Sequence, residues 1–266
     1  MLSTQASAHN PRAPHIGHLA LLLAILATAL FLCVLPLARA SAPTARQGVV
    51  AQAAAYGLFL LIAWPIFALL WKRPFLQGIS WNAPGVRPWL IVFGLAVGFA
   101  AQEIETFLPV PAKMPIEEIF KAPHLIWLLL PFAVFAGPLI EEIVFRGFML
   151  PAFANAIDWL RLPRGADRDE ALVNLEQWRV APSSSTHALV ASSIVTSVLF
   201  ALVHAPQLGL SWPSVSLLAA ISLVLCWVRL HFRSLAASTL VHCFYNLSVF
   251  VSLAITTDGF RHMNKL

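Results

Sequence analysis

Three groups of polar residues lie inside long apolar stretches, and the first contains three ionisable side chains. It consists of Glu141, Glu142 and Arg146, preceded by Gly137-Pro138. An ionised side chain at the centre of a membrane-spanning helix costs about 2.5–3.5 kcal/mol on insertion scales, so such residues are candidates for function. Glu142 precedes Arg146 by four residues, the favoured order for an ion pair within a helix. Glu141 projects about 100° away around the helix and is free to face another partner.

Pro138 is expected to loosen the helix just before the two acids, because it has no backbone N–H. Irregular backbone at membrane depth is tolerated where it lines a cavity. We therefore expect freed carbonyl groups and a polar cavity beside Glu141. The alternative is a helix end at the membrane surface, where charged side chains are solvated. The apolar run that continues over residues 147–153 disfavours it.

Two later groups each place polar side chains on one face of a helix. Phe200 and His204 are four residues apart, as are His242 and Asn246, and this spacing is that of one helical face. The Phe200 ring is placed to orient the imidazole of His204. Each group alone has an ordinary interpretation. His204 would be an interfacial residue, and His242 with Asn246 would form hydrogen bonds between helices.

The composition is that of a membrane protein. The chain is 59% hydrophobic and 11% charged, whereas soluble domains are about 45–50% apolar and about 25% charged. The net charge of +5 comes from basic residues in short loops, which indicate topology and not nucleic-acid binding. The odd number of cysteines, Cys33, Cys226 and Cys243, argues against a disulfide framework.

The apolar runs predict an all-α, polytopic transmembrane bundle of about seven helices, or eight, with a polar catalytic cavity. A spanning helix needs about 20 apolar residues. Gly94 and Gly98 have the spacing that lets helices approach closely, although this pattern is common by chance. The first run exceeds the usual length of a signal-peptide core, so we expect an uncleaved helix. The predicted spans are 17–38, 51–71, 88–107, 125–150, 187–204, 213–230 and 234–256.

Taken together, the three motifs resemble the CPBP family. They read Glu-Glu-x-x-x-Arg, Phe-x-x-x-His and His-x-x-x-Asn, in this order and in separate predicted helices. That family contains the type II CAAX prenyl endopeptidases and the bacterial bacteriocin-processing and immunity (Abi) proteins. The resemblance covers roughly residues 130–250 and includes the Gly-Pro before the acids and the Arg-Gly after them. The long insertion at 157–185 departs from the usual pattern.

The resemblance implies an intramembrane endopeptidase. Glu141 and His204 would activate a water for attack on a peptide carbonyl, and a carboxylate in a cavity of low dielectric suits a general base. Donors at His242 and Asn246 would stabilise the oxyanion. The residues implied as catalytic are Glu141, His204, His242 and Asn246. The supporting residues are Glu142, Arg146 and Phe200.

No cofactor is assigned, and a zinc ion is the alternative. The chain has no His-Glu-x-x-His motif, which excludes the common zinc-protease arrangement. Glu141, His204 and His242 are residue types that form open three-ligand zinc sites. Asn246 is an uncommon zinc ligand, so a metal-free scheme accounts for four residues and a zinc scheme for three. We therefore expect a metal-free, glutamate-dependent peptidase.

The domain organisation follows from these patterns. Residues 1–124 form N-terminal transmembrane helices and loops without a family signature. Residues 125–256 form the CPBP-like catalytic membrane core, and residues 257–266 a C-terminal tail. The hydrophilic insertion at about 157–185 is expected to hold a short surface helix around 167–179. A second acidic pair, within Pro115–Lys121, is interpreted as an exposed amphipathic segment, a lid or a substrate ramp.

The expected partners are the lipid bilayer and a membrane-associated protein or peptide substrate, with no nucleic acid. The Lys and Arg residues number ten on the inner side and six on the outer side if the N-terminus is inside, which favours that orientation. We expect a bacterial inner membrane. Family members cut prenylated tails, bacteriocin leaders or membrane-anchored sorting tails, and the sequence does not choose among them. The alternatives are a non-enzymatic immunity or scaffold protein of the same fold, and a transporter.

Overall fold

Helices make up the regular structure of the described part of the chain, as its apolar runs predict. The computed structural model describes residues 14–39, 44–82, 87–109, 125–163, 165–181 and 183–261. Within these ranges seven helices are long and apolar enough to cross a membrane. The predicted all-α polytopic bundle is confirmed, and the chain is an integral membrane protein. The acidic pair within 110–124 lies outside the described residues.

The observed helices follow the predicted spans closely, except that the second begins at Ala45 and not at residue 51, and that the fourth is longer than predicted. The fourth span is a composite helix from Ile126 to Leu160, so its predicted end at residue 150 was wrong. Pro151 lies at the start of segment α8, a position where its missing N–H does little harm. The other long helices are α1 (Ile16–Ala38), α2 (Ala45–Trp71), α4 (Pro88–Thr106), α10 (Thr186–His204), α11 (Trp212–His231) and α12 (Leu235–Thr256). The short ones are α3 (Phe75–Gly78) and α9 (Arg168–Val180), and α9 is the surface helix predicted in the insertion.

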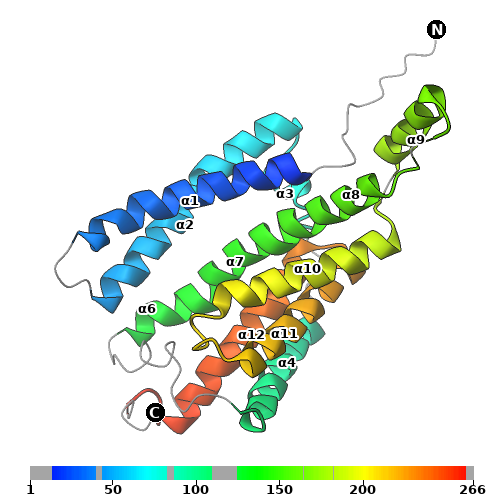
Figure 1. Ribbon diagram of the computed structural model, residues 1–266. Coiled ribbons are helices and arrows are strands. Elements are labelled where there is room, and N and C mark those ends of the chain that lie inside the picture. The colour runs from blue at the N-terminus through cyan, green and yellow to red at the C-terminus, as the bar shows by residue number, and fades with distance from the viewer. Residues whose placement is uncertain are drawn as a thin grey trace.

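The composite helix is the central element of the bundle. It consists of α6 (Ile126–Pro131), η1 (Phe132–Ala136), α7 (Gly137–Glu142), η2 (Ile143–Met149) and α8 (Leu150–Leu160). Helices α1 and α2 form a hairpin on one side of it, and α10, α11, α12 and α4 lie on the other (Figure 1). Its polar residues are therefore surrounded by helices from both halves of the chain.

Helices α4 and α12 approach each other closely at Gly94 and Gly98. A Cβ atom at Gly94 would lie 2.6 Å from the carbonyl oxygen of Val241, and one at Gly98 would lie 2.8 Å from that of Tyr245. Glycine at these positions lets the two backbones meet, as the small-residue spacing indicated. The contact fixes the part of α12 that carries His242.

We expect Gly98→Ala to destabilise the protein by about 1–3 kcal/mol, the usual cost of overpacking a tight contact. The added methyl group would overlap the Tyr245 carbonyl and the Ser248 hydroxyl. Thermal unfolding of the purified protein in detergent measures the change. Gly57→Ala in α2 is the matched control, because nothing lies within 4 Å of its Cβ position. Equal unfolding midpoints for the two variants would contradict the close approach.

The segment after α3 holds the connection between α11 and α12 in place. The Leu235 N–H donates to the Ser80 carbonyl at 3.0 Å. The Arg229 guanidinium donates to the Ile79 carbonyl at 3.5 Å. These bonds tie the start of α12 to the N-terminal half of the chain.

Candidate active site

The composite helix departs from α-helical hydrogen bonding on both sides of the two acids. The segments η1 and η2 are π-helical, a rare geometry that is frequent at functional sites. In η1 the Gly137 N–H donates to the Phe132 carbonyl, five residues earlier. In the same register the Ala133 carbonyl would need an N–H from Pro138, which has none. The proline thus frees a carbonyl group in front of the acids, as the sequence predicted.

Asn246, on α12, donates a hydrogen bond to this freed carbonyl. Its Nδ2 donates to the Ala133 oxygen at 2.7 Å. The bond links α12 to the composite helix one helical turn beyond His242. The amide nitrogen carries two hydrogens, and the oxyanion role implied by the resemblance needs only one of them.

Glu142 and Arg146 form the ion pair that their spacing predicted. Arg146 Nη1 lies 2.9 Å from Glu142 Oε1, and both side chains have 0% exposure. Arg146 Nη2 also donates to the Ser222 hydroxyl at 2.7 Å and to its carbonyl at 3.1 Å. The guanidinium carbon lies 4.7 Å from the centre of the Phe200 ring, within cation–π distance. Arg146 therefore joins the composite helix to α10 and α11.

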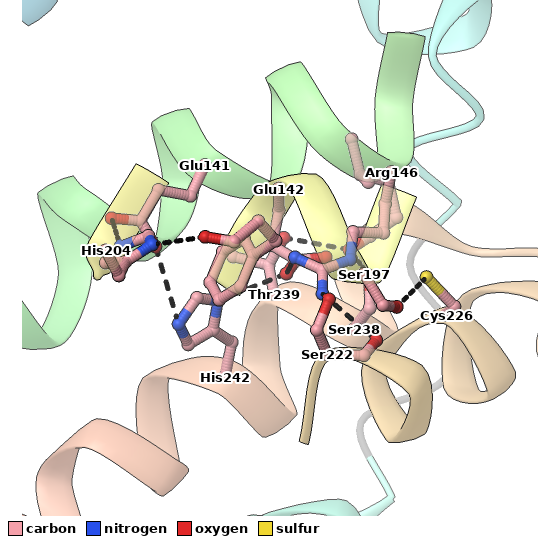
Figure 2. Close-up of polar contacts among 12 residues, drawn as sticks. Glu141, Glu142, Arg146, Ser197, His204, Ser222, Cys226, Ser238, Thr239 and His242 are labelled. Carbon is pink, nitrogen blue, oxygen red and sulfur yellow. Dashed lines mark hydrogen bonds and ion pairs between the residues drawn. The ribbon is translucent and has the colours of Figure 1, made fainter. Parts of the chain in front are cut away.

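Glu141 faces away from this ion pair, toward two histidines on other helices (Figure 2). Its Oε1 lies 3.6 Å from His204 Nε2, and its Oε2 lies 3.6 Å from His242 Nε2. The Glu141 side chain is 23% exposed, whereas that of Glu142 is 0% exposed. The two adjacent carboxylates thus differ in character. One is enclosed in an ion pair, and the other is partly exposed.

The Nδ1 atoms of both histidines have hydrogen-bond partners, and these partners determine which ring nitrogen carries the hydrogen. His204 Nδ1 lies 2.7 Å from the Phe200 carbonyl oxygen, and His242 Nδ1 lies 3.1 Å from Glu142 Oε1. Because a carbonyl or carboxylate oxygen only accepts, each Nδ1 carries a hydrogen. The Nε2 of each neutral ring is then an acceptor that faces the Glu141 carboxylate. Such a set of acceptors suits a shared water molecule or proton.

Phe200 packs among the charged and aromatic members of the site. Its ring centre lies 4.5 Å from that of His204 and 5.9 Å from that of His242. The side chain is buried, so it restricts how both imidazoles turn. The structure thus places Phe200 where the sequence expected support for His204.

Sequence reasoning missed Ser222. It lies on α11, buried, where it accepts from Arg146. No motif spacing involves it, because the contact joins residues 76 positions apart. A buried serine in an apolar helix was the only indication.

Glu141, His204 and His242 are the residues that a zinc site here would use. Within the described ranges, no group of three or more His, Cys, Asp or Glu side chains is arranged to hold a metal ion. Each histidine Nε2 faces a different oxygen of Glu141. The chemistry derived below uses only side chains of the chain.

Comparison with known proteins identifies the segment that carries this site. Residues 123–248 match the family described as type II CAAX prenyl endopeptidase Rce1-like. No curated protein and no solved structure matches the chain. The matched segment includes all three motifs, and α1, α2 and α4 lie outside it. The membrane core of this chain, residues 123–248, is therefore similar to the Rce1-like type II CAAX prenyl endopeptidases.

Proposed function

We propose that the chain is a glutamate-dependent intramembrane endopeptidase that hydrolyses a peptide bond in a membrane-associated protein or peptide. At the level of the family, the matched core is that of a CAAX-type intramembrane protease. One observation carries the finer proposal. The partly exposed Glu141 carboxylate lies 3.6 Å from the Nε2 of each of two histidines, on helices α10 and α12.

In the proposed reaction Glu141 is the general base. A water held by Glu141 and His204 bonds through its oxygen to the carbonyl carbon of the substrate, and Glu141 takes one of its protons. The carbonyl π electrons move to oxygen and form the oxyanion. When the intermediate collapses, the C–N bond breaks and the proton passes from Glu141 to the leaving nitrogen. The products are a carboxylic acid and an amine, and the Glu141 carboxylate is restored.

His242 and Asn246 are proposed to stabilise the oxyanion. His242 donates from Nε2 when its ring carries both hydrogens, and the Glu142 carboxylate holds the ring through Nδ1. Asn246 lies one turn further along α12, held by the Ala133 carbonyl. Donors fixed in this way need no reorganisation as charge develops.

We also infer a bacterial inner membrane, with the N-terminus inside. The start of α1, the end of α2, where Lys72 is the C-cap, and helix α9 lie at one end of the bundle (Figure 1). This grouping of basic segments supports the inference, because cytoplasmic ends of membrane proteins are enriched in Lys and Arg.

A panel of membrane peptides tests the proposed function. Purified protein in lipid vesicles is incubated with prenylated C-terminal tails, unprenylated leader peptides and membrane-anchored tails, and the fragments are identified by mass spectrometry. We expect one class to yield a defined pair of fragments. Fragments that also form with Glu141→Gln would arise from a contaminating protease.

A strong chelator is expected to leave this cleavage unchanged, because Glu141 and the two histidines supply the base and the donors themselves. The rate is measured before and after chelation, and again after Zn²⁺ is added back. Complete loss that Zn²⁺ restores would contradict the metal-free scheme and favour a zinc site at the same residues.

A further inference from the structure

Helix α2 reaches the site through Tyr56. The Tyr56 ring stacks on the Phe132 ring, with centres 5.6 Å apart and planes at 14°. Phe132 is the first residue of η1. Tyr56 itself lies outside the segment that matches the family. A part of the chain without a family motif thus contacts the helix that carries Glu141.

The stacked ring and the Glu141 carboxylate lie along the same stretch of the composite helix. The Gly137 N–H donates to the Phe132 carbonyl, which places Gly137 one π-helical turn after Phe132. Glu141 Oε1 lies over Gly137, 3.8 Å from where a Cβ would stand. Tyr56 therefore packs on the turn of the composite helix over which the Glu141 carboxylate lies.

Gln52 orients the Tyr56 hydroxyl. Its Nε2 donates to the phenol oxygen at 2.9 Å, from one turn earlier on α2. The oxygen accepts this bond, so the phenol hydrogen points elsewhere as a donor. The Glu141 carboxylate only accepts, and each histidine Nε2 accepts while its ring is neutral. A hydroxyl donor on α2 adds the kind of group that a developing oxyanion requires.

We propose that the substrate peptide binds between α2 and the composite helix, and that the Tyr56 hydroxyl donates a hydrogen bond to its scissile carbonyl oxygen. The bond strengthens as the oxyanion forms. Tyr56 is then a catalytic residue, and Gln52 is the residue that positions it. This proposal rests on the proposed peptidase function.

The Tyr56→Phe variant tests it, because phenylalanine keeps the ring on Phe132 and removes only the hydroxyl. We expect kcat to fall about 100-fold, the lower end of the effect of removing one oxyanion donor, with little change in KM. Tyr245→Phe is the matched control. Tyr245 is the only other tyrosine of the chain, and it lies on α12 where that helix meets Gly98 of α4. This control should keep the wild-type rate.

A double-mutant cycle separates positioning from packing. Gln52→Leu should lower kcat less than Tyr56→Phe does, and Gln52→Leu/Tyr56→Phe should match Tyr56→Phe alone, because Gln52 acts through the hydroxyl. Additive losses would assign Gln52 a separate role and contradict this positioning.

The possible results distinguish a failure of the role of Tyr56 from a failure of the peptidase function. Wild-type kcat in Tyr56→Phe, with Glu141→Gln inactive, would overturn the role of Tyr56 and leave the peptidase function standing. A wild-type protein that cleaves no membrane peptide would overturn both. A Tyr56→Phe variant with a raised KM and an unchanged kcat would show a hydroxyl that binds substrate without stabilising the oxyanion, which also contradicts the proposal.

Discussion

Glu141→Gln is expected to lower the kcat of peptide cleavage by about 10²–10⁴-fold, the contribution of a positioned general base. The amide is nearly isosteric with the carboxylate but takes up no proton from water. The side chain is partly exposed and lies outside the buried ion pair, so the protein should stay folded. Cleavage kinetics and thermal unfolding of the same preparation measure the two effects.

The adjacent acid is the matched control for this prediction. Glu142→Gln makes the same chemical change one residue along, but at a carboxylate that binds Arg146 at 2.9 Å and is fully buried. We expect it to lower the unfolding midpoint, whereas Glu141→Gln should not. Full cleavage by Glu141→Gln would remove the proposed base from the mechanism.

Arg146→Met is expected to destabilise the protein by about 3–5 kcal/mol, the cost of leaving one member of a buried ion pair without its partner. The guanidinium contacts Glu142, Ser222 and the Phe200 ring, so its loss opens contacts on three helices. Unfolding in detergent, followed by circular dichroism, measures the change in midpoint.

The chain offers both a control and a rescue for this variant. Arg179 and Glu176 on α9 form a pair at 3.5 Å with side chains 65% and 64% exposed. Arg179→Met should therefore change stability by less than about 1 kcal/mol. Glu142→Gln/Arg146→Met should be more stable than Arg146→Met, because no charge is left buried alone. A single variant at Arg146 as stable as the wild type would contradict the structural role of the pair.

The sequence predicted those parts of the site that depend on spacing along one helix. Because Glu142 precedes Arg146 by four residues, the sequence predicted their ion pair. Because neighbouring residues of a helix point about 100° apart, it also predicted that Glu141 faces elsewhere. Because an ionised side chain is unfavourable in the membrane interior, Glu141 was expected to face polar groups on other helices. The structure brings it to His204 and His242.

The remaining features depend on contacts between helices, which no spacing within one helix specifies. Pro138 predicted a freed carbonyl, but not that Asn246 would bind it. Ser222 and Tyr56 belong to no motif, and they join the site only because α11 and α2 pack against the composite helix. The composite helix continues past its predicted end at residue 150 to Leu160, because Pro151 does not break it.

The central claim is that Glu141 is the base with which this membrane protein cuts its substrate. Comparative proteomics of cells that express wild type or Glu141→Gln at equal levels tests it most directly, through the termini of all membrane proteins. We expect at least one membrane protein whose new terminus occurs only with the wild type, and whose uncut form accumulates with Glu141→Gln. Identical termini in the two strains would contradict it.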